Sequence, residues 1–124
     1  MAVTHGATTR TVIADAVVDR IDVGGTGTLV FDTSGDVEVA TLTFSATAFG
    51  AASGPTATAN AITADSSATG GTIAKVKLVG VTHGSVVMGS VTATGGGGDI
   101  ELNSVVVSAG QQVSVSSLTY TAPV

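Results

Sequence analysis

Cysteine and tryptophan are absent from this sequence of 124 residues, and only 3% of its residues are aromatic. Without cysteine the chain has neither a disulfide framework nor a thiolate metal site, and it suits any redox compartment. The few aromatic side chains also weaken a carbohydrate-binding interpretation, because sugar rings usually stack on Trp or Tyr faces. Thiol chemistry is therefore excluded.

Charged side chains are scarce as well. They make up 10% of the sequence, against about 25% in an average soluble domain. Nine acidic residues outnumber four basic ones, Arg10, Arg20, Lys75 and Lys77, and the formal net charge is -5. A surface that neutralises nucleic-acid phosphates needs clustered Lys and Arg. Nucleic acid is therefore not expected as a partner.

Long apolar runs are missing too. No stretch approaches the roughly 20 consecutive apolar residues that a membrane-spanning helix requires. The first ten residues, MAVTHGATTR, lack the basic start and the apolar centre of a secretory signal. We therefore expect neither a membrane partner nor export.

Five small residue types fill most of the sequence: Thr, Val, Ala, Gly and Ser account for 87 of the 124 residues. Val and Thr favour strands, because branching at Cβ suits an extended backbone. Val and Ala bury less apolar surface per side chain than Leu or Phe do. The composition predicts one mainly β domain over residues 1–124, with a modest core that neighbouring subunits would help to stabilise.

Residues 9–22 are the exception to the β pattern. Ile13, Val17 and Ile21 recur every fourth residue, and charged residues mark a polar face, namely Arg10, Asp15, Asp19 and Asp22. This spacing predicts an amphipathic helix, preceded by an N-terminal arm over residues 1–8.

Both ends of this helix carry recognisable signals. The hydroxyl of Thr8 or Thr9 can accept hydrogen bonds from the first free main-chain N–H groups. Gly24 and Gly25 can supply the positive φ with which helices often end. We therefore expect a Thr cap at the start and a glycine exit at the end.

The rest of the sequence, residues 28–124, reads as short strands separated by turns. Residues 33–36 (TSGD) predict a hairpin between two strands, with Leu42 and Phe44 facing the core and Glu38 at its wet edge. The expected strands are 28–31, 37–45, 56–62, 72–79, 85–93, 99–102, 104–108 and 112–120. This number of strands favours an antiparallel β-sandwich of jelly-roll type with one N-terminal amphipathic α-helix.

Two glycine runs interrupt this pattern. Residues 24–27 follow a helix instead of preceding one, and residues 95–98 lead to Asp99, which would repel a phosphate. We therefore interpret both runs as connectors and not as phosphate cradles. Since glycine loses the most entropy on ordering, residues 95–98 are expected to be mobile, or ordered only by a neighbour.

His5 and His83 are the only imidazoles. They could share a metal ion or act as a general base, but neither lies in a G-x-S-x-G or H-E-x-x-H motif. Solvated loop histidines are the simpler interpretation. The sequence therefore predicts no catalytic, cofactor-binding or metal-binding residue.

Two groups of acidic residues lie close together in the sequence. Asp32, Asp36 and Glu38 could bind Ca²⁺ through oxygen, but their spacing matches no calcium loop, and Asp next to Gly is common in hairpin turns. Asp99 and Glu101 alternate with apolar neighbours, as on a half-exposed strand. The first group is interpreted as turn chemistry and the second as a solvated face.

Three segments resemble small structural proteins encoded among the head genes of tailed bacteriophages and prophages. They are ADAVVDRIDVGG (residues 14–25), ATLTFSATAFGAASGPTATANAITAD (residues 40–65) and IELNSVVVSAGQQVSVSSLTYTAP (residues 100–123). The resemblance implies a capsid decoration, or cement, protein with a jelly-roll fold. Such a protein is made in the bacterial cytoplasm, binds the major capsid protein on the outer surface of the virion, and ties capsomers together non-covalently without a cofactor.

This resemblance leads to a hypothesis of adhesion by a homo-oligomer, a dimer or a trimer. The arm is short and has little to anchor it, so the expected capsid or subunit contacts are Val3, Thr4, His5 and Arg10, together with exposed strand edges. Two alternatives stay open: a carbohydrate-binding or adhesin module of a phage fibre or cell surface, and a hydrolase that uses His5 or His83.

Overall fold

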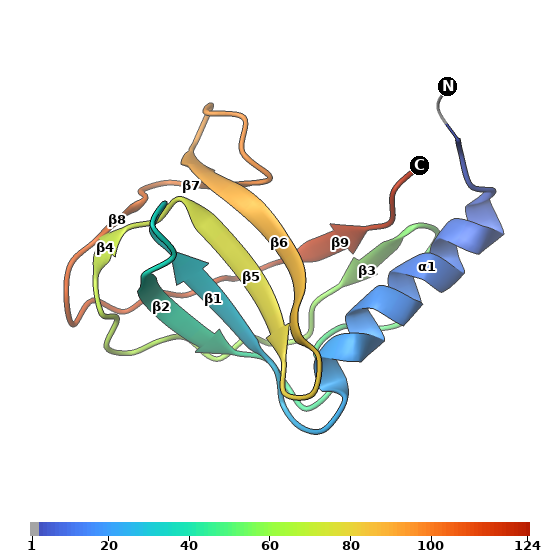
Figure 1. Ribbon diagram of the computed structural model, residues 1–124, viewed down its shortest axis with the longest axis horizontal. Helices are drawn as coiled ribbons and strands as arrows, with labels where there is room; N and C mark the ends of the chain where they lie inside the picture. Colours follow the sequence, from blue (N-terminus) through green and yellow to red (C-terminus); the bar gives the residue numbers. More distant parts are fainter. Residues whose placement is uncertain (1–2) are drawn as a thin grey trace.

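The computed structural model describes residues 3–124 (Figure 1). A helix, α1 (Ala7–Asp19), continues into a 3-10 turn, η1 (Arg20–Asp22). The strands are β1 (Thr28–Asp32), β2 (Glu38–Thr43), β3 (Thr56–Thr58), β4 (Gly71–Thr72), β5 (Lys75–Gly80), β6 (Gly84–Ala93), β7 (Ile100–Leu102), β8 (Val106–Val107) and β9 (Thr119–Thr121). The mainly β class with one N-terminal helix is confirmed.

Five strands form the central sheet, in the order β2-β1-β5-β6-β7. The expected hairpin between β1 and β2 is confirmed: Thr33 N–H donates to the Val37 carbonyl (2.8 Å), and Asp36 takes a positive φ of 65°. Ladder irregularities at Phe31/Asp32 and Leu78/Val79 add local twist. The sheet therefore curls, and its inner face is concave.

The pairing of β7 departs from the expected antiparallel arrangement. β7 runs parallel to β6, with Val91 opposite Ile100, across a connection of only six residues. Gly95 and Gly97, with φ of 88° and 80°, reverse the chain there, in a conformation that residues with a Cβ rarely adopt. The glycine run makes a tight parallel return possible and leaves β7 at the edge of the sheet.

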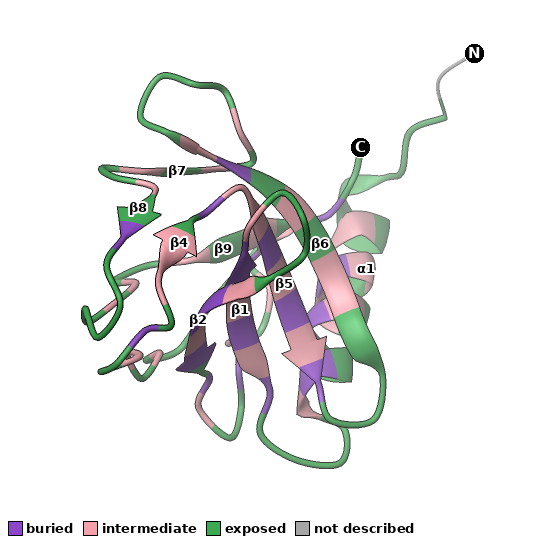
Figure 2. Cartoon of the chain, turned by 60° about the vertical axis from the view of Figure 1, so that its left-hand side comes forward, coloured by how far each residue is buried: buried purple, intermediate pink, exposed green. Residues whose placement is uncertain are grey.

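Two short antiparallel ladders, β3–β9 and β4–β8, lie outside the central sheet. Between them and the sheet lie the buried side chains, including Leu29, Phe31, Leu42 and Phe44. The rings of Phe44 and Phe49 pack at a centroid distance of 5.7 Å. Figure 2 shows the buried residues concentrated in the central strands, with exposed residues in the loops. Leu42 and Phe44 therefore face the core, as the alternation predicts.

The helix begins at a different residue, and buries a different face, from those that the sequence predicts. Gly6 is its N-cap, without a side-chain hydrogen bond, so the helix starts at Ala7 and the expected Thr cap is wrong. Its buried residues are Ala14 and Val18, followed by Ile21 in η1. The expected row based on Ile13 and Val17 is therefore displaced by one residue.

This displacement follows from two aspartates that the sequence placed on the polar face. The Asp15 carboxylate accepts a hydrogen bond from Ala52 N–H (2.7 Å), and the Asp22 carboxylate accepts one from Ala48 N–H (2.9 Å). Because both acceptors bind the same loop, the helix presents this side to the body of the protein, where it packs on β3 and β9. The predicted solvent-facing role of these two aspartates is wrong.

Several predicted strands are shorter or broken; the stretch 104–108, for example, is a strand only over Val106–Val107. The stretch 56–62 is a strand only over Thr56–Thr58, and the stretch 72–79 divides into β4 and β5 around Ile73, whose N–H donates to Val105. In the stretch 112–120, only Thr119 and Tyr120 belong to a strand. Its alternation is real, since Val113, Val115 and Leu118 pack against the core, but residues 114–117 have no neighbouring strand among residues 3–124.

The junction between helix and sheet depends on Gly27 and Gly80. A Cβ added at Gly80 would lie 2.8 Å from the Arg20 carbonyl oxygen and 3.1 Å from that of Ile21. A Cβ at Gly27 would collide with the Ile21 side chain. The end of the helix can approach the sheet this closely only because both positions lack a side chain.

We predict that Gly80→Ala lowers the free energy of unfolding by about 1–3 kcal/mol, the usual effect of overpacking. Urea denaturation of the purified protein measures the change. Gly35→Ala is the matched control: its Cβ would meet only the Thr33 hydroxyl at 3.8 Å, so stability should change by less than about 0.5 kcal/mol. Equal effects of the two substitutions would contradict the close approach at Ile21.

Candidate functional site

The predicted contact residues lie at the start of the chain, beside its C-terminal residues. We call residues 3–6 the arm; all four are exposed and belong to no helix or ladder, and Met1 and Ala2 lie outside the described residues. The expected arm over residues 1–8 is thus shorter, since α1 begins at Ala7. Val3 exposes 72% of its surface, and Val124 exposes 65%.

Arg10 joins the helix to the C-terminal residues. Its Nη2 donates to the Ala122 carbonyl (2.8 Å) and its Nε to the Pro123 carbonyl (3.2 Å). His5 Nδ1 lies 3.4 Å from the main-chain oxygen of Val124. The structure therefore brings His5 and Arg10 to one place, which we call the terminal patch: His5, Arg10, Pro123 and Val124.

The two histidines lie at opposite ends of α1. His5 precedes the helix, whereas His83, in the turn between β5 and β6, has its Nδ1 3.0 Å from Nη2 of Arg20. Thirteen helical residues at about 1.5 Å each keep the imidazoles too far apart to share a metal ion. In residues 3–124, no group of three or more His, Cys, Asp or Glu side chains is placed to hold a metal.

The acidic group that could have bound Ca²⁺ is divided among separate partners. Buried Asp32 has Oδ2 2.9 Å from Nζ of Lys77, an ion pair and not a well-directed hydrogen bond. Asp36 accepts from Nζ of Lys75 at 2.8 Å, and this hydrogen bond lowers the pKa of the Asp36 carboxyl. Glu38 accepts hydrogen bonds from two threonine hydroxyls. The three carboxylates therefore do not converge on one point.

Asp99 and Glu101 are exposed, as expected for a solvated face, and they also organise the glycine loop. Glu101 accepts from Gly95 N–H (3.3 Å) and Gly97 N–H (2.9 Å). Asp99 accepts from the N–H and the hydroxyl of Ser90, at 2.8 and 3.0 Å. The loop is thus anchored by its own chain, and needs no neighbour for order. An acid directly after a glycine run was the signal that sequence reasoning missed.

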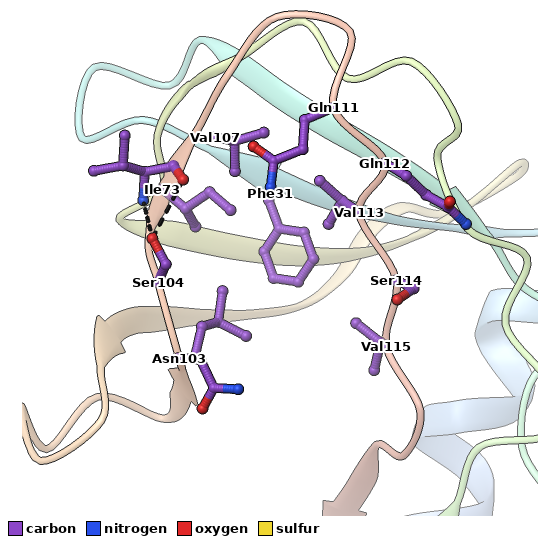
Figure 3. Close-up of a pocket in the computed structure, with 12 residues that line it drawn as sticks. Phe31, Ile73, Asn103, Ser104, Val107, Gln111, Gln112, Val113, Ser114 and Val115 are labelled. Atoms are coloured by element: carbon purple, nitrogen blue, oxygen red, sulfur yellow. Dashed lines mark hydrogen bonds between the residues drawn. The ribbon is translucent and has the colours of Figure 1, made fainter.

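Three hollows lie near β7: two between it and the segment that precedes β9, and one between β5, β6 and β9. The first, of about 280 Å³, has Phe31 at its centre, with residues 103–104 on one side and 111–115 on the other (Figure 3). The second, of about 240 Å³, is walled by residues 100–103 and 114–118 over Leu29 and Phe31. The third, of about 480 Å³, reaches Tyr120. Polar residues such as Asn103 and Ser114 line the first two hollows together with apolar Phe31.

Comparison with known proteins gives no relative. No protein-family model, no curated protein and no solved structure matches this chain. Of the helices in the described part of the chain, none has the length and apolar character needed to cross a membrane.

We predict that Asp99→Asn reduces the acid sensitivity of the fold. Hydrogen bonds from Ser90 lower the pKa of the Asp99 carboxyl. Its stabilising contribution is therefore complete above its ordinary pKa, and is lost as the pH falls below about 4 through the lowered value. The melting temperature should fall less between neutral pH and pH 3 in the variant than in the wild type.

The control for this measurement is Asp19→Asn. Asp19 is exposed on α1 and has no hydrogen-bond partner for its carboxylate among residues 3–124. This substitution removes the same charge without removing the contacts to Ser90. If both variants flatten the pH dependence equally, loss of charge alone explains the effect and the Asp99 prediction is wrong.

Proposed function

We propose that this chain is a head-decoration, or cement, protein of a tailed bacteriophage or prophage. It is made in the bacterial cytoplasm, binds the major capsid protein on the outer surface of the virion, and ties capsomers together by non-covalent adhesion, without catalysis. The jelly-roll assignment belongs to this proposal and rests on the number of short strands in the sequence and on the resemblance.

One observation carries the proposal: the three segments that resemble phage head proteins form one connected unit in space. Helix residues Asp15 and Asp22 bind the loop that holds Ala48 and Ala52. β3 pairs with β9, and Asp65 and Val113 exchange main-chain hydrogen bonds of 2.9 and 2.8 Å. The likeness therefore covers residues that pack on one another, as expected for a shared fold unit and not for scattered similarity in composition.

The terminal patch is the surface that this proposal assigns to adhesion. It exposes apolar Val124 next to the main-chain carbonyls that Arg10 holds. Arg10 ties the helix to the C-terminal residues, so the patch is presented by a fixed scaffold although the arm itself is short. Repetition over a lattice then multiplies weak single contacts.

Two other functions receive less support. A carbohydrate platform needs exposed aromatic faces, but Phe31, Phe44 and Phe49 are buried and Tyr120 is half-buried. A hydrolase needs a nucleophile and a base within hydrogen-bonding distance. The imidazoles of His5 and His83 instead lie next to a main-chain oxygen and the Arg20 guanidinium, respectively.

We predict that capsids lacking this protein lose resistance to heat and regain it when the purified protein is added back. Arg10→Ala should weaken binding to such capsids by about tenfold or more, because it removes hydrogen bonds from a charged donor that order the patch. Co-sedimentation measures binding, and the temperature of DNA release measures the effect on the capsid.

Arg20→Ala is the matched control, since Arg20 contacts His83 at the other end of the helix. It should bind capsids as the wild type does. Equal heat resistance of capsids with and without the protein, or its absence from purified virions by mass spectrometry, would contradict the proposed function.

A further inference from the structure

The hollow between β7 and the segment before β9 has the features of a site for a missing strand. We call it the slot: the space walled by residues 100–103 and 114–118 over Leu29 and Phe31. β7 ends the central sheet, so it has a strand partner on one side only. Across the slot, the main chain of residues 114–117 has no hydrogen-bond partner among residues 3–124. Residues 114–117 therefore present unpaired N–H and C=O groups, and β7 presents the strand edge that faces away from β6.

The chemistry of these walls specifies the kind of ligand. Unpaired main-chain groups along an edge are satisfied by another extended polypeptide, which adds as a strand. Because side chains of a strand alternate, such a ligand would place every second residue on the apolar floor and the others toward solvent. A small molecule could satisfy few of the groups on the two walls.

We propose that the slot accepts an extended strand, and that its occupant is the N-terminal arm of a second copy of this chain. In the arm, Val3 is 72% exposed and none of the four residues belongs to a ladder. Other connections are already held: Glu101 binds the glycine loop, Asp15 and Asp22 bind the loop after β2, and Arg10 binds the C-terminal residues.

The sequence of the arm fits the slot. In an extended strand, Val3 would face the apolar floor and Thr4 the solvent. The first 14 residues contain no acidic residue, so the arm brings no like charge close to Glu101 on the wall of the slot. The contact is head-to-tail, which closes into a ring when the rotation between copies allows it. This inference does not rest on the proposed capsid function.

Cysteine trapping tests the proposal directly, because the chain has no cysteine of its own. Val3→Cys protein is mixed with isotopically labelled Ser116→Cys protein under mild oxidation. The expected result is a labelled–unlabelled disulfide dimer, since Cα atoms must come within about 7 Å to form the bond. The matched control replaces Val3→Cys by Val12→Cys, because Val12 is similarly exposed (67%) but lies on α1. Equal yields from the two pairs would overturn the proposal.

Sedimentation and amide exchange provide the second test. Wild-type protein and Val12→Asp should self-associate, with exchange at residues 114–117 slowing as concentration rises; Val3→Asp should stay monomeric and exchange rapidly. Protection that is independent of concentration but lost in Val3→Asp would show that each chain fills its own slot. Rapid exchange at residues 114–117 at every concentration would indicate that the slot binds a strand of another protein. Either result would overturn a second copy as the occupant.

Discussion

Carboxylates that accept hydrogen bonds from main-chain N–H groups fix the loops of this protein, whose small side chains bury too little apolar surface to do so. Five of the nine acidic residues serve in this way: Asp15, Asp22, Asp65, Asp99 and Glu101. A loop of Ala, Gly, Ser and Thr has little apolar surface to bury, so hydrogen bonds to a charged acceptor, which are stronger than neutral ones, decide where it lies. Two further carboxylates pair with Lys75 and Lys77. Most of the negative charges are therefore engaged in contacts within the fold.

Because these carboxylates already have partners within the chain, they limit what the surface can recognise. The Phe rings are buried, and most carboxylates already have partners within the chain. Exposed hydroxyls, single Val side chains and main-chain edges remain, and these distinguish partners by shape and strand pairing more than by long-range charge. Such a surface fits adhesion to a repeating protein lattice better than it fits a charged or aromatic ligand.

Local patterns predicted the local parts of the fold, and failed where pairing depended on distant segments. The β1–β2 hairpin followed from the TSGD turn and from the alternation around Leu42 and Phe44. The inward Asp15 and Asp22 could not be predicted, because their donors are 37 and 26 residues away. Alternation in residues 112–120 correctly indicated side chains packed on the core, but alternation does not say whether a neighbouring strand exists. Of the candidate site, His5 and Arg10 were identified from the sequence, whereas their partners at the C-terminal end were not.

The slot and the modest core have the same cause, which is the scarcity of large side chains in the sequence. With few large side chains available, residues 114–117 lie over the core without filling the space next to β7, and their main-chain groups are left to water. Any strand that enters the slot buries part of the floor and pairs both walls, so it stabilises the folded state in proportion to the logarithm of its concentration. Copies fixed side by side on a lattice have a high effective concentration for one another. Weak strand exchange between neighbours would then supply stability that the isolated chain, with its small core, lacks.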